Sequence, residues 1–367
     1  MFREIFSTEI WLTSTTIISL LYAIYIMSLK DSRFLRGNKN VFFSCIVSLF
    51  VILYIGTRPL WCYADTGLYT MIFNLVQTGI WESLPSDNSE PFFTLIENIC
   101  IQMANASTWL LVISIFYIVA MVWAAYKWLP RHLLFTIVFL FTAFSFWGYA
   151  TNGIRHGMAT SLSMLGLSFL MSNRRNIIIG YSLLVAATLT HTSCALILAS
   201  ATIALFYNKF SVYFKIWAIC IVVSLIFQEQ TKQLFSFIID DNRMSNYLIT
   251  MQQSYELEYE SGYRWDFILY SFLPIILGWY TIKRVHSVDK IYLFILNTYI
   301  IANSFWVLIN TVAFSNRFAY LSWFLYPILL AYPLCNYKIF KSQSLTSGGI
   351  IILSSLFTYF MLSWTSP

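Results

Sequence analysis

Two arginines of this chain stand at the start of apolar stretches, where a guanidinium group could bind an anion. Arg155 closes the segment Thr151-Asn152-Gly153-Ile154-Arg155, and Arg317 closes Ser315-Asn316-Arg317. Residue types that cap helix N-termini precede both arginines. The positive end of a helix dipole and the free N–H groups of its first turn attract anions, and a guanidinium adds to that attraction. The sequence therefore predicts an anion-binding corner at each arginine, although a single arginine also occurs at such corners when its side chain extends to lipid headgroups.

Three further side chains have the chemistry of a general base. His191 lies in the polar turn Thr190-His191-Thr192-Ser193 between two apolar stretches. A histidine there either lines a cavity or is satisfied as a core residue by a neighbouring helix. Asp65 and Glu90 are candidates for the base or for orienting the arginines. A purely structural pairing of these carboxylates with Arg58 explains them equally well.

The composition places these residues in a membrane protein. Of the 367 residues, 59% are hydrophobic, 19% aromatic and only 10% charged, which excludes a soluble domain of ordinary composition. The net charge of +6 lies in short loops between apolar stretches and does not indicate nucleic-acid binding. With about 20 residues per span as the ruler, we predict an all-α polytopic integral membrane protein of about 12 transmembrane helices. The predicted crossings are 10–29, 41–57, 107–126, 132–150, 153–171, a close pair within 177–207, 216–228, 266–282, 291–313, 318–335 and 348–364.

The charges then separate by side. The crossings put 15 of the 22 lysines and arginines on one side and 14 of the 16 carboxylates on the other. The positive-inside rule makes the first side cytoplasmic and leaves both termini outside. Arg58, Arg155, Arg264 and Arg317 lie on the outer side, against that bias, and arginines in such places commonly bind an anion.

The chain is predicted to be a single transmembrane domain, 1–367, whose substrate face consists of two long outer segments, 58–106 and 229–265. Within the first segment, the stretches 66–81 and 91–104 are too short or too polar to span, and we predict interfacial or re-entrant helices there. The second segment combines tyrosines with carboxylates, which suits carbohydrate binding. An aromatic belt at the membrane interface has the same composition.

The stretch 177–207 has an unusual length for its charge pattern. Because basic residues flank it on both sides, its 31 residues must cross twice. Halves of about 14 and 16 residues reach only about 21 and 24 Å, short of a hydrocarbon core of about 30 Å. We therefore expect the turn that holds His191 to lie below the outer surface.

Five short motifs occur in order along most of the chain, from about residue 58 to residue 320. They are Arg58-x6-Asp65-x3-Tyr69, Glu90-Pro91-x-Phe93, Ile154-Arg155-His156-Gly157-Met158-Ala159, His191-Thr192-Ser193 and Arg317-x2-Tyr320. In this order and topology they resemble the EpsG-like branch of the Wzy proteins, the bacterial O-antigen and exopolysaccharide polymerases. The chain departs from the family pattern at His156, where glutamine is expected, and at Phe92, where glycine is usual.

The resemblance implies a polymerase that moves a growing glycan from undecaprenyl pyrophosphate to the sugar of an incoming lipid-linked repeat unit. The reaction would take place at the periplasmic face of the bacterial inner membrane, with both chain termini on that side. The expected partners are undecaprenyl-pyrophosphate-linked oligosaccharides, the lipid bilayer, and a flippase and a chain-length regulator of the same pathway.

The implied chemistry assigns roles to the residues already singled out. Developing charge on a pyrophosphate leaving group needs fixed cations. The expected binding residues are Arg58, Arg155, Arg317 and Arg264, with Tyr69 and His156. His191 is the first candidate for the base that deprotonates the acceptor hydroxyl, followed by Asp65 and Glu90. The sequence contains no metal-ligand cluster, so we expect no metal or cofactor, with arginine in place of a divalent ion.

Two other functions fit parts of the sequence. A lipid-linked oligosaccharide flippase or other secondary transporter also explains twelve crossings and a buried His191. Such proteins commonly have repeated halves, however, and this sequence shows no internal repeat. A membrane acyltransferase that modifies glycans would be expected to carry a histidine pair or a His-Asp pair at its catalytic face, and only His191 is so placed in the sequence.

Overall fold

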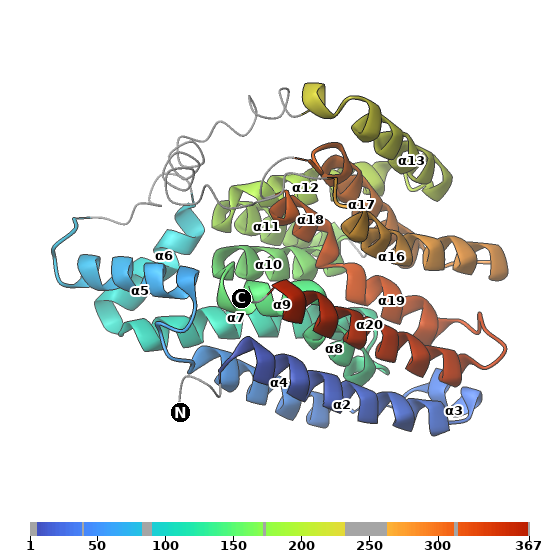
Figure 1. The fold of residues 1–367 in the computed structure, drawn as a ribbon, viewed down its shortest axis with the longest axis horizontal. Helices are drawn as coiled ribbons and strands as arrows, with labels where there is room; N and C mark the ends of the chain where they lie inside the picture. The colour runs from blue at the N-terminus through green and yellow to red at the C-terminus, as the bar shows by residue number, and fades with distance from the viewer. Residues whose placement is uncertain are drawn as a thin grey trace.

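The computed structural model describes residues 6–38, 40–82, 90–171, 174–231, 263–311 and 315–365. Regular structure in these ranges is helical, without a β-strand, which confirms the predicted all-α class (Figure 1). The helices are α2 (Thr8–Ser28), α3 (Asp31–Arg36), α4 (Val41–Gly56), α5 (Ala64–Gln77), α6 (Pro91–Met103), α7 (Ala106–Trp128), α8 (Leu133–Phe141), α9 (Phe144–Thr151), α10 (Ile154–Leu170), α11 (Arg174–Thr190), α12 (Ala195–Phe206), α13 (Phe210–Ile226), α16 (Trp265–Arg284), α17 (Lys290–Leu308), α18 (Asn316–Trp323), α19 (Tyr326–Asn336) and α20 (Gln343–Thr365). Most of the predicted outer segment 229–265, namely residues 232–262, lies outside the described ranges, as do residues 83–89 of the segment 58–106.

Fewer helices than predicted are long enough to cross a membrane. Among the described residues, six segments meet the length and composition of a span. They are α2, α7, α16, α17, α20 and the stretch Asn316–Asn336, which contains α18 and α19. Counting α8 and α9 as one bent span makes seven. Four further apolar helices, α4, α11, α12 and α13, are shorter. The 16 residues of α4, for example, extend for only about 24 Å. Each predicted crossing coincides with a described helix or helix pair, but the number of about twelve crossings stays a prediction.

Two predicted crossings are each divided into two helices, and the pair predicted within 177–207 is separated by a turn, as expected. The stretch 132–150 forms α8 and α9, which meet at 67°. The break follows Thr142, whose hydroxyl donates to the carbonyl oxygen of Val138 at 2.7 Å, a bond that commonly bends helices. The stretch 318–335 divides into α18 and α19, with Pro327 in the first turn of α19. The reversal predicted within 177–207 is the 3₁₀ turn Thr192–Cys194 between α11 and α12.

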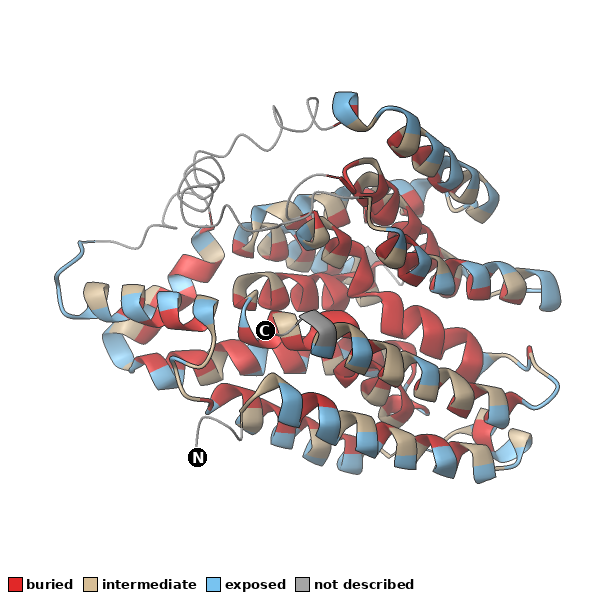
Figure 2. Ribbon diagram, viewed as in Figure 1, coloured by how far each residue is buried: buried red, intermediate tan, exposed pale blue. Residues whose placement is uncertain are grey.

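The buried centre of the bundle contains α10, α17 and α19, which Figure 2 shows mostly as buried. Asn303 of α17 links four helices there, and its side-chain amide has partners on both ends. The carbonyl oxygen accepts from Trp217 Nε1 at 2.8 Å, and the nitrogen donates to Ser271 Oγ at 3.1 Å and Ser322 Oγ at 3.0 Å. Trp323 Nε1 also donates to Ser271 Oγ, at 2.7 Å. We refer to these five residues as the Asn303 network.

Different helix ends lie at the two ends of the bundle. At one end, Thr8 Oγ1 accepts a hydrogen bond from Trp147 Nε1 at 3.0 Å, which places the start of α2 beside α9. At the other end, Asp31 accepts from the main-chain nitrogen of Ser344, at 2.9 Å. Because α2 and α20 run antiparallel, with Gly348 packed against Ala23, both described chain ends lie at the first end, together with α5 and α6 (Figure 1).

The predicted stretches 66–81 and 91–104 correspond to α5 and α6, so their helical character is confirmed. Both are amphipathic and pack on each other and on the start of α7. Their interfacial or re-entrant placement stays a prediction.

Candidate functional site

An ion pair joins the starts of two helices, α6 and α10, at the end of the bundle where both described chain ends lie. Glu90 is the N-cap residue of α6, and Pro91 occupies the first turn, where its missing N–H is no loss. Arg155 is the second residue of α10. Arg155 Nη1 donates to Glu90 Oε2, and the Glu90 side chain is only 5% exposed. A buried carboxylate needs such a partner, because an isolated buried charge is costly.

Two histidines extend this ion pair. Glu90 Oε1 lies 3.7 Å from His191 Nε2, in the turn after α11. The ring of His191 stacks on the ring of His156, with 3.6 Å between centroids and 21° between planes. Ser193 Oγ lies 2.8 Å from His156 Nε2 and 2.8 Å from His191 Nδ1. We call Glu90, Arg155, His156, His191 and Ser193 the Glu90 cluster.

Helix α5 adds Asp65 and Tyr69, which the i, i+4 spacing places on one face. The ring of Tyr69 lies 4.9 Å from the guanidinium carbon of Arg155, a cation–π distance. Burial raises the pKa of Tyr69 to about 12, against the opposing charge of Arg155. Burial also raises the pKa of Asp65, opposed by the positive charges of Arg317 and Arg155. Both arginines therefore lie within electrostatic reach of the same carboxyl group.

Arg317 reaches this place from α18, 162 positions further along the chain than Arg155. It is exposed, at the start of its helix. Tyr320 of the same helix packs edge-on against Tyr149 of α9, with 5.0 Å between ring centroids, and Tyr149 stacks on His156 at 5.8 Å. The structure thus brings the two predicted arginine corners to the same end of the bundle.

Arg58 is buried, and its guanidinium contacts other protein atoms. It is 3% exposed, and its guanidinium donates to the carbonyl oxygen of Ile55 at 2.7 Å, to Thr66 Oγ1 at 2.9 Å and to the carbonyl oxygen of Thr151 at 3.4 Å. Burial lowers its pKa to about 10, so it keeps its charge at neutral pH. Arg58 therefore joins α4, α5 and α9 just before the α10 corner, an arrangement that favours support of the site over direct contact with an anion.

Arg264 precedes α16 and has a local partner. Its guanidinium forms a two-point contact with Asp266, at 2.9 and 2.6 Å, and lies 3.7 Å from the ring centroid of Phe267. Both charged side chains are 40% exposed. Of the four predicted arginines, Arg155 and Arg317 are the two whose positive charges act on both Asp65 and His156.

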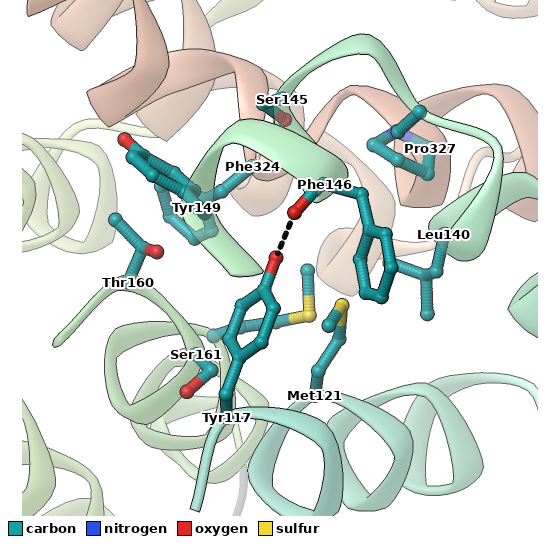
Figure 3. Close-up of a pocket in the computed structure, with 12 residues that line it drawn as sticks. Tyr117, Met121, Leu140, Ser145, Phe146, Tyr149, Thr160, Ser161, Phe324 and Pro327 are labelled. Carbon is teal, nitrogen blue, oxygen red and sulfur yellow. Dashed lines mark hydrogen bonds between the residues drawn. The ribbon is translucent and has the colours of Figure 1, made fainter. Parts of the chain in front are cut away.

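A small cavity lies behind the site, next to Tyr149 (Figure 3). Its volume is about 20 Å³, enough for a single water molecule. The Tyr149 hydroxyl at its wall is buried and has no hydrogen-bond partner, whereas the Tyr117 hydroxyl donates to the carbonyl oxygen of Phe146 at 3.2 Å. The cavity is too small for a sugar. Arg317, by contrast, is exposed at this end of the bundle.

Sequence reasoning did not anticipate the contact between His156 and His191, nor the bridging position of Ser193. Ser193 was visible only as a neighbour of His191, and His156 only as a departure from a family pattern. His156 and Ser193 are 37 residues apart in the sequence, so no pattern of neighbouring residues predicts their contact. Within the described ranges, no group of three or more histidine, cysteine or acidic residues could hold a metal ion.

Comparison with known proteins gives one match. The model of the EpsG family matches residues 41–367, which include every residue of the site described above. No curated protein and no solved structure matches the chain.

Proposed function

Since the chain belongs to the EpsG family, we propose that it is a polysaccharide polymerase that extends a glycan carried on undecaprenyl pyrophosphate. The growing glycan is transferred to a hydroxyl of the sugar in an incoming lipid-linked repeat unit. In this proposal the site faces the periplasm from the inner membrane, where lipid-linked oligosaccharides, a flippase and a chain-length regulator are its partners. O-antigen repeat units are the proposed substrate class.

The observation that carries the proposal is that α10 and α18 bring Arg155 and Arg317 to the same end of the bundle. There Tyr320 packs on Tyr149, and Tyr149 stacks on His156. The positive charges of both arginines act on Asp65. Each arginine opens a helix, so the helix dipoles add to the positive field. Nη1 of Arg155 is paired with Glu90, and the Arg155 side chain remains 23% exposed. A guanidinium held in this way keeps donors for a phosphate oxygen.

The proposed reaction breaks the bond between the anomeric carbon of the donor sugar and the pyrophosphate oxygen. The leaving pyrophosphate takes the electron pair, and Arg155 and Arg317 stabilise its charge. The acceptor hydroxyl oxygen forms the new bond to the anomeric carbon, and its proton passes to His191. The carboxylate of Glu90, 3.7 Å from His191 Nε2, stabilises the imidazolium that results.

One observation favours a second candidate, a membrane acyltransferase that modifies glycans. The sequence showed only one well-placed histidine, whereas the structure stacks His156 on His191 and bridges them with Ser193. Histidines that hold a serine hydroxyl are typical of acyl transfer. The family membership favours the polymerase, and the two activities leave different products: longer glycans in one case, acylated glycans of unchanged length in the other.

The proposed function is tested by Arg155→Ala and Arg317→Ala in the strain that carries this gene. Arg33→Ala, an exposed arginine of α3 at the opposite end, is the matched control. We expect both site variants to be present in the membrane in normal amount but to leave glycans of a single repeat unit, while the control forms full-length ladders. Full-length ladders from both site variants would refute the anion site, and glycans that lose acyl groups without changing length would favour the acyltransferase.

A further inference from the structure

The hydrogen bonds around Ser193 have a defined direction. The main-chain nitrogen of Ser193 lies 3.4 Å from His191 Nδ1 and can only donate. His191 Nδ1 is therefore an unprotonated acceptor, and the Ser193 hydroxyl, 2.8 Å away, donates to the same atom. Since that hydroxyl has one proton, its oxygen accepts from His156 Nε2, which must carry the hydrogen. His156 therefore donates a hydrogen bond to Ser193, and Ser193 donates one to His191.

This direction fixes the protonation of His191 as well. A neutral imidazole carries one N–H, and with Nδ1 bare that hydrogen is on Nε2, facing Glu90 Oε1. Neither nitrogen of His191 is then open to an acceptor sugar, because Nε2 holds a hydrogen and Nδ1 is covered by Ser193. The Ser193 hydroxyl is hydrogen-bonded to Nδ1, the ring nitrogen of His191 that has no hydrogen. The turn that carries it is partly exposed, and its neighbour Thr192 is exposed.

We propose that Ser193 is a catalytic residue that relays the proton of the acceptor hydroxyl to His191. This inference rests on the proposed polymerase function. As the acceptor oxygen bonds to the anomeric carbon and the pyrophosphate leaves, the acceptor's proton passes to Ser193 Oγ, and the proton of Ser193 passes to His191 Nδ1. Glu90 stabilises the imidazolium, the N–H of His156 stabilises negative charge on Oγ during transfer, and the imidazolium later releases its proton to solvent.

The same hydroxyl could instead attack the donor sugar and form a glycosyl–serine intermediate. Chemistry favours the relay, because the second step of a covalent route would have to expel a serine alkoxide. That leaving group is as poor as the sugar alkoxide of the finished glycosidic bond. Enzymes that form glycosyl intermediates commonly use a carboxylate, which leaves far more easily.

The test uses purified full-length protein in lipid nanodiscs, with lipid-linked repeat units extracted from a strain that lacks its polymerase. The variants are Ser193→Ala, Ser193→Thr and, as matched control in the same turn, Thr192→Ala. We expect Ser193→Ala to lower kcat on the order of 100-fold, with little change in KM, because general acid–base groups contribute roughly 10² to 10⁴ in rate. Ser193→Thr, which keeps a hydroxyl, should recover at least about tenfold of the loss, and Thr192→Ala should match the wild type.

Two further readouts separate a relay from a structural role. The residual activity of Ser193→Ala should rise with pH, since hydroxide replaces the lost base, while its thermal unfolding midpoint stays near that of the wild type. His156→Gln, whose amide N–H can donate to Ser193 Oγ, should keep more activity than His156→Leu. A Ser193→Ala variant with wild-type kcat, or a sugar covalently attached to Ser193 in a single turnover, would overturn the relay. A wild-type protein that makes no polymer in this assay would instead refute the proposed function.

Discussion

The Asn303 network and the Glu90 cluster are both buried groups of polar side chains, yet they are built in opposite ways. In the Asn303 network every member is neutral, and the amide of Asn303 has partners for its oxygen and its nitrogen. Asn303, Ser271 and Ser322 have no exposed surface. The Glu90 cluster contains an ion pair and two stacked imidazoles, and the side chains of Arg155 and His191 remain 23% and 19% exposed.

The difference shows which group holds the fold and which one has chemistry available. A buried network with every polar atom paired stabilises one arrangement of its helices. Charged groups in a partly buried place cost stability unless they are paired, and such groups concentrate at functional sites. The two groups are also connected, because Ser322 of the Asn303 network belongs to α18, the helix that carries Arg317. The network therefore positions one of the two arginines of the site.

The largest effect is expected from Glu90→Gln, which keeps the shape of the side chain and removes its charge. The imidazolium of His191 loses its counter-charge and Arg155 loses its ion-pair partner, so we expect chain growth to slow by about 100-fold or more. The measurement is the rate of glycan elongation by purified protein.

Glu97→Gln provides the comparison, since Glu97 is a buried carboxylate on the same helix, 2% exposed and outside the Glu90 cluster. Its elongation rate should stay close to that of the wild type. Equal losses in the two variants would mean that buried charge on α6 matters in general and that Glu90 has no special part.

A different kind of loss is expected from Asn303→Leu. The substitution keeps the branched shape of the side chain but leaves Trp217 Nε1 and two serine hydroxyls without their shared partner, at a cost of about 1–3 kcal/mol in the free energy of unfolding. The measurement is the thermal midpoint in detergent, together with elongation per folded molecule at low temperature. A fall in stability with unchanged elongation per molecule would support a structural role for the Asn303 network. A fully folded Asn303→Leu protein that fails to elongate would contradict it.

The smallest effect is expected from Asp65→Asn, and it is a gain in stability at neutral pH. Burial raises the pKa of Asp65 in the folded protein, so the ionised carboxylate destabilises the folded state when the pH is above that pKa. As the pH falls through this pKa toward the unfolded value near about 4, the wild type becomes protonated and its disadvantage disappears. Thermal midpoints of the two proteins should therefore differ at pH 7 and converge at pH 4. A higher midpoint for the wild type at pH 7 would show that Arg155 and Arg317 outweigh burial.

The sequence predicted the helical class and the location of nearly every helix, because long apolar stretches bounded by charges leave few alternatives. It did not predict the breaks at Thr142 and before Pro327, and these depend on side-chain hydrogen bonds and packing of the final fold. The breaks do not explain why six or seven described spans stand against about twelve predicted crossings. That difference comes from five helices of 17 residues or fewer, namely α4, α10, α11, α12 and α13.

For the site, the sequence predicted the features that depend on neighbouring residues, such as where helices begin. The capping residue types before Arg155 and Arg317 correctly predicted helix starts. The charge bias of the loops predicted that both would lie at one end. Arg58 carried the same signals as these two, but its environment is decided by Thr66 and Thr151, which only the folded chain brings to it. The stacking of His156 on His191 depends on how α10 packs against the turn after α11, and no spacing in the sequence encodes it.

The central claim is that Arg155 and Arg317 bind one pyrophosphate together. It is tested most directly by the dissociation constant of undecaprenyl pyrophosphate for the wild type, Arg155→Ala, Arg317→Ala and the double variant in nanodiscs. We predict that each single variant weakens binding by at least about tenfold. The double variant should bind more weakly than the wild type by less than the product of the two single effects, since both groups contact one ligand. Wild-type affinity in both single variants would contradict the account.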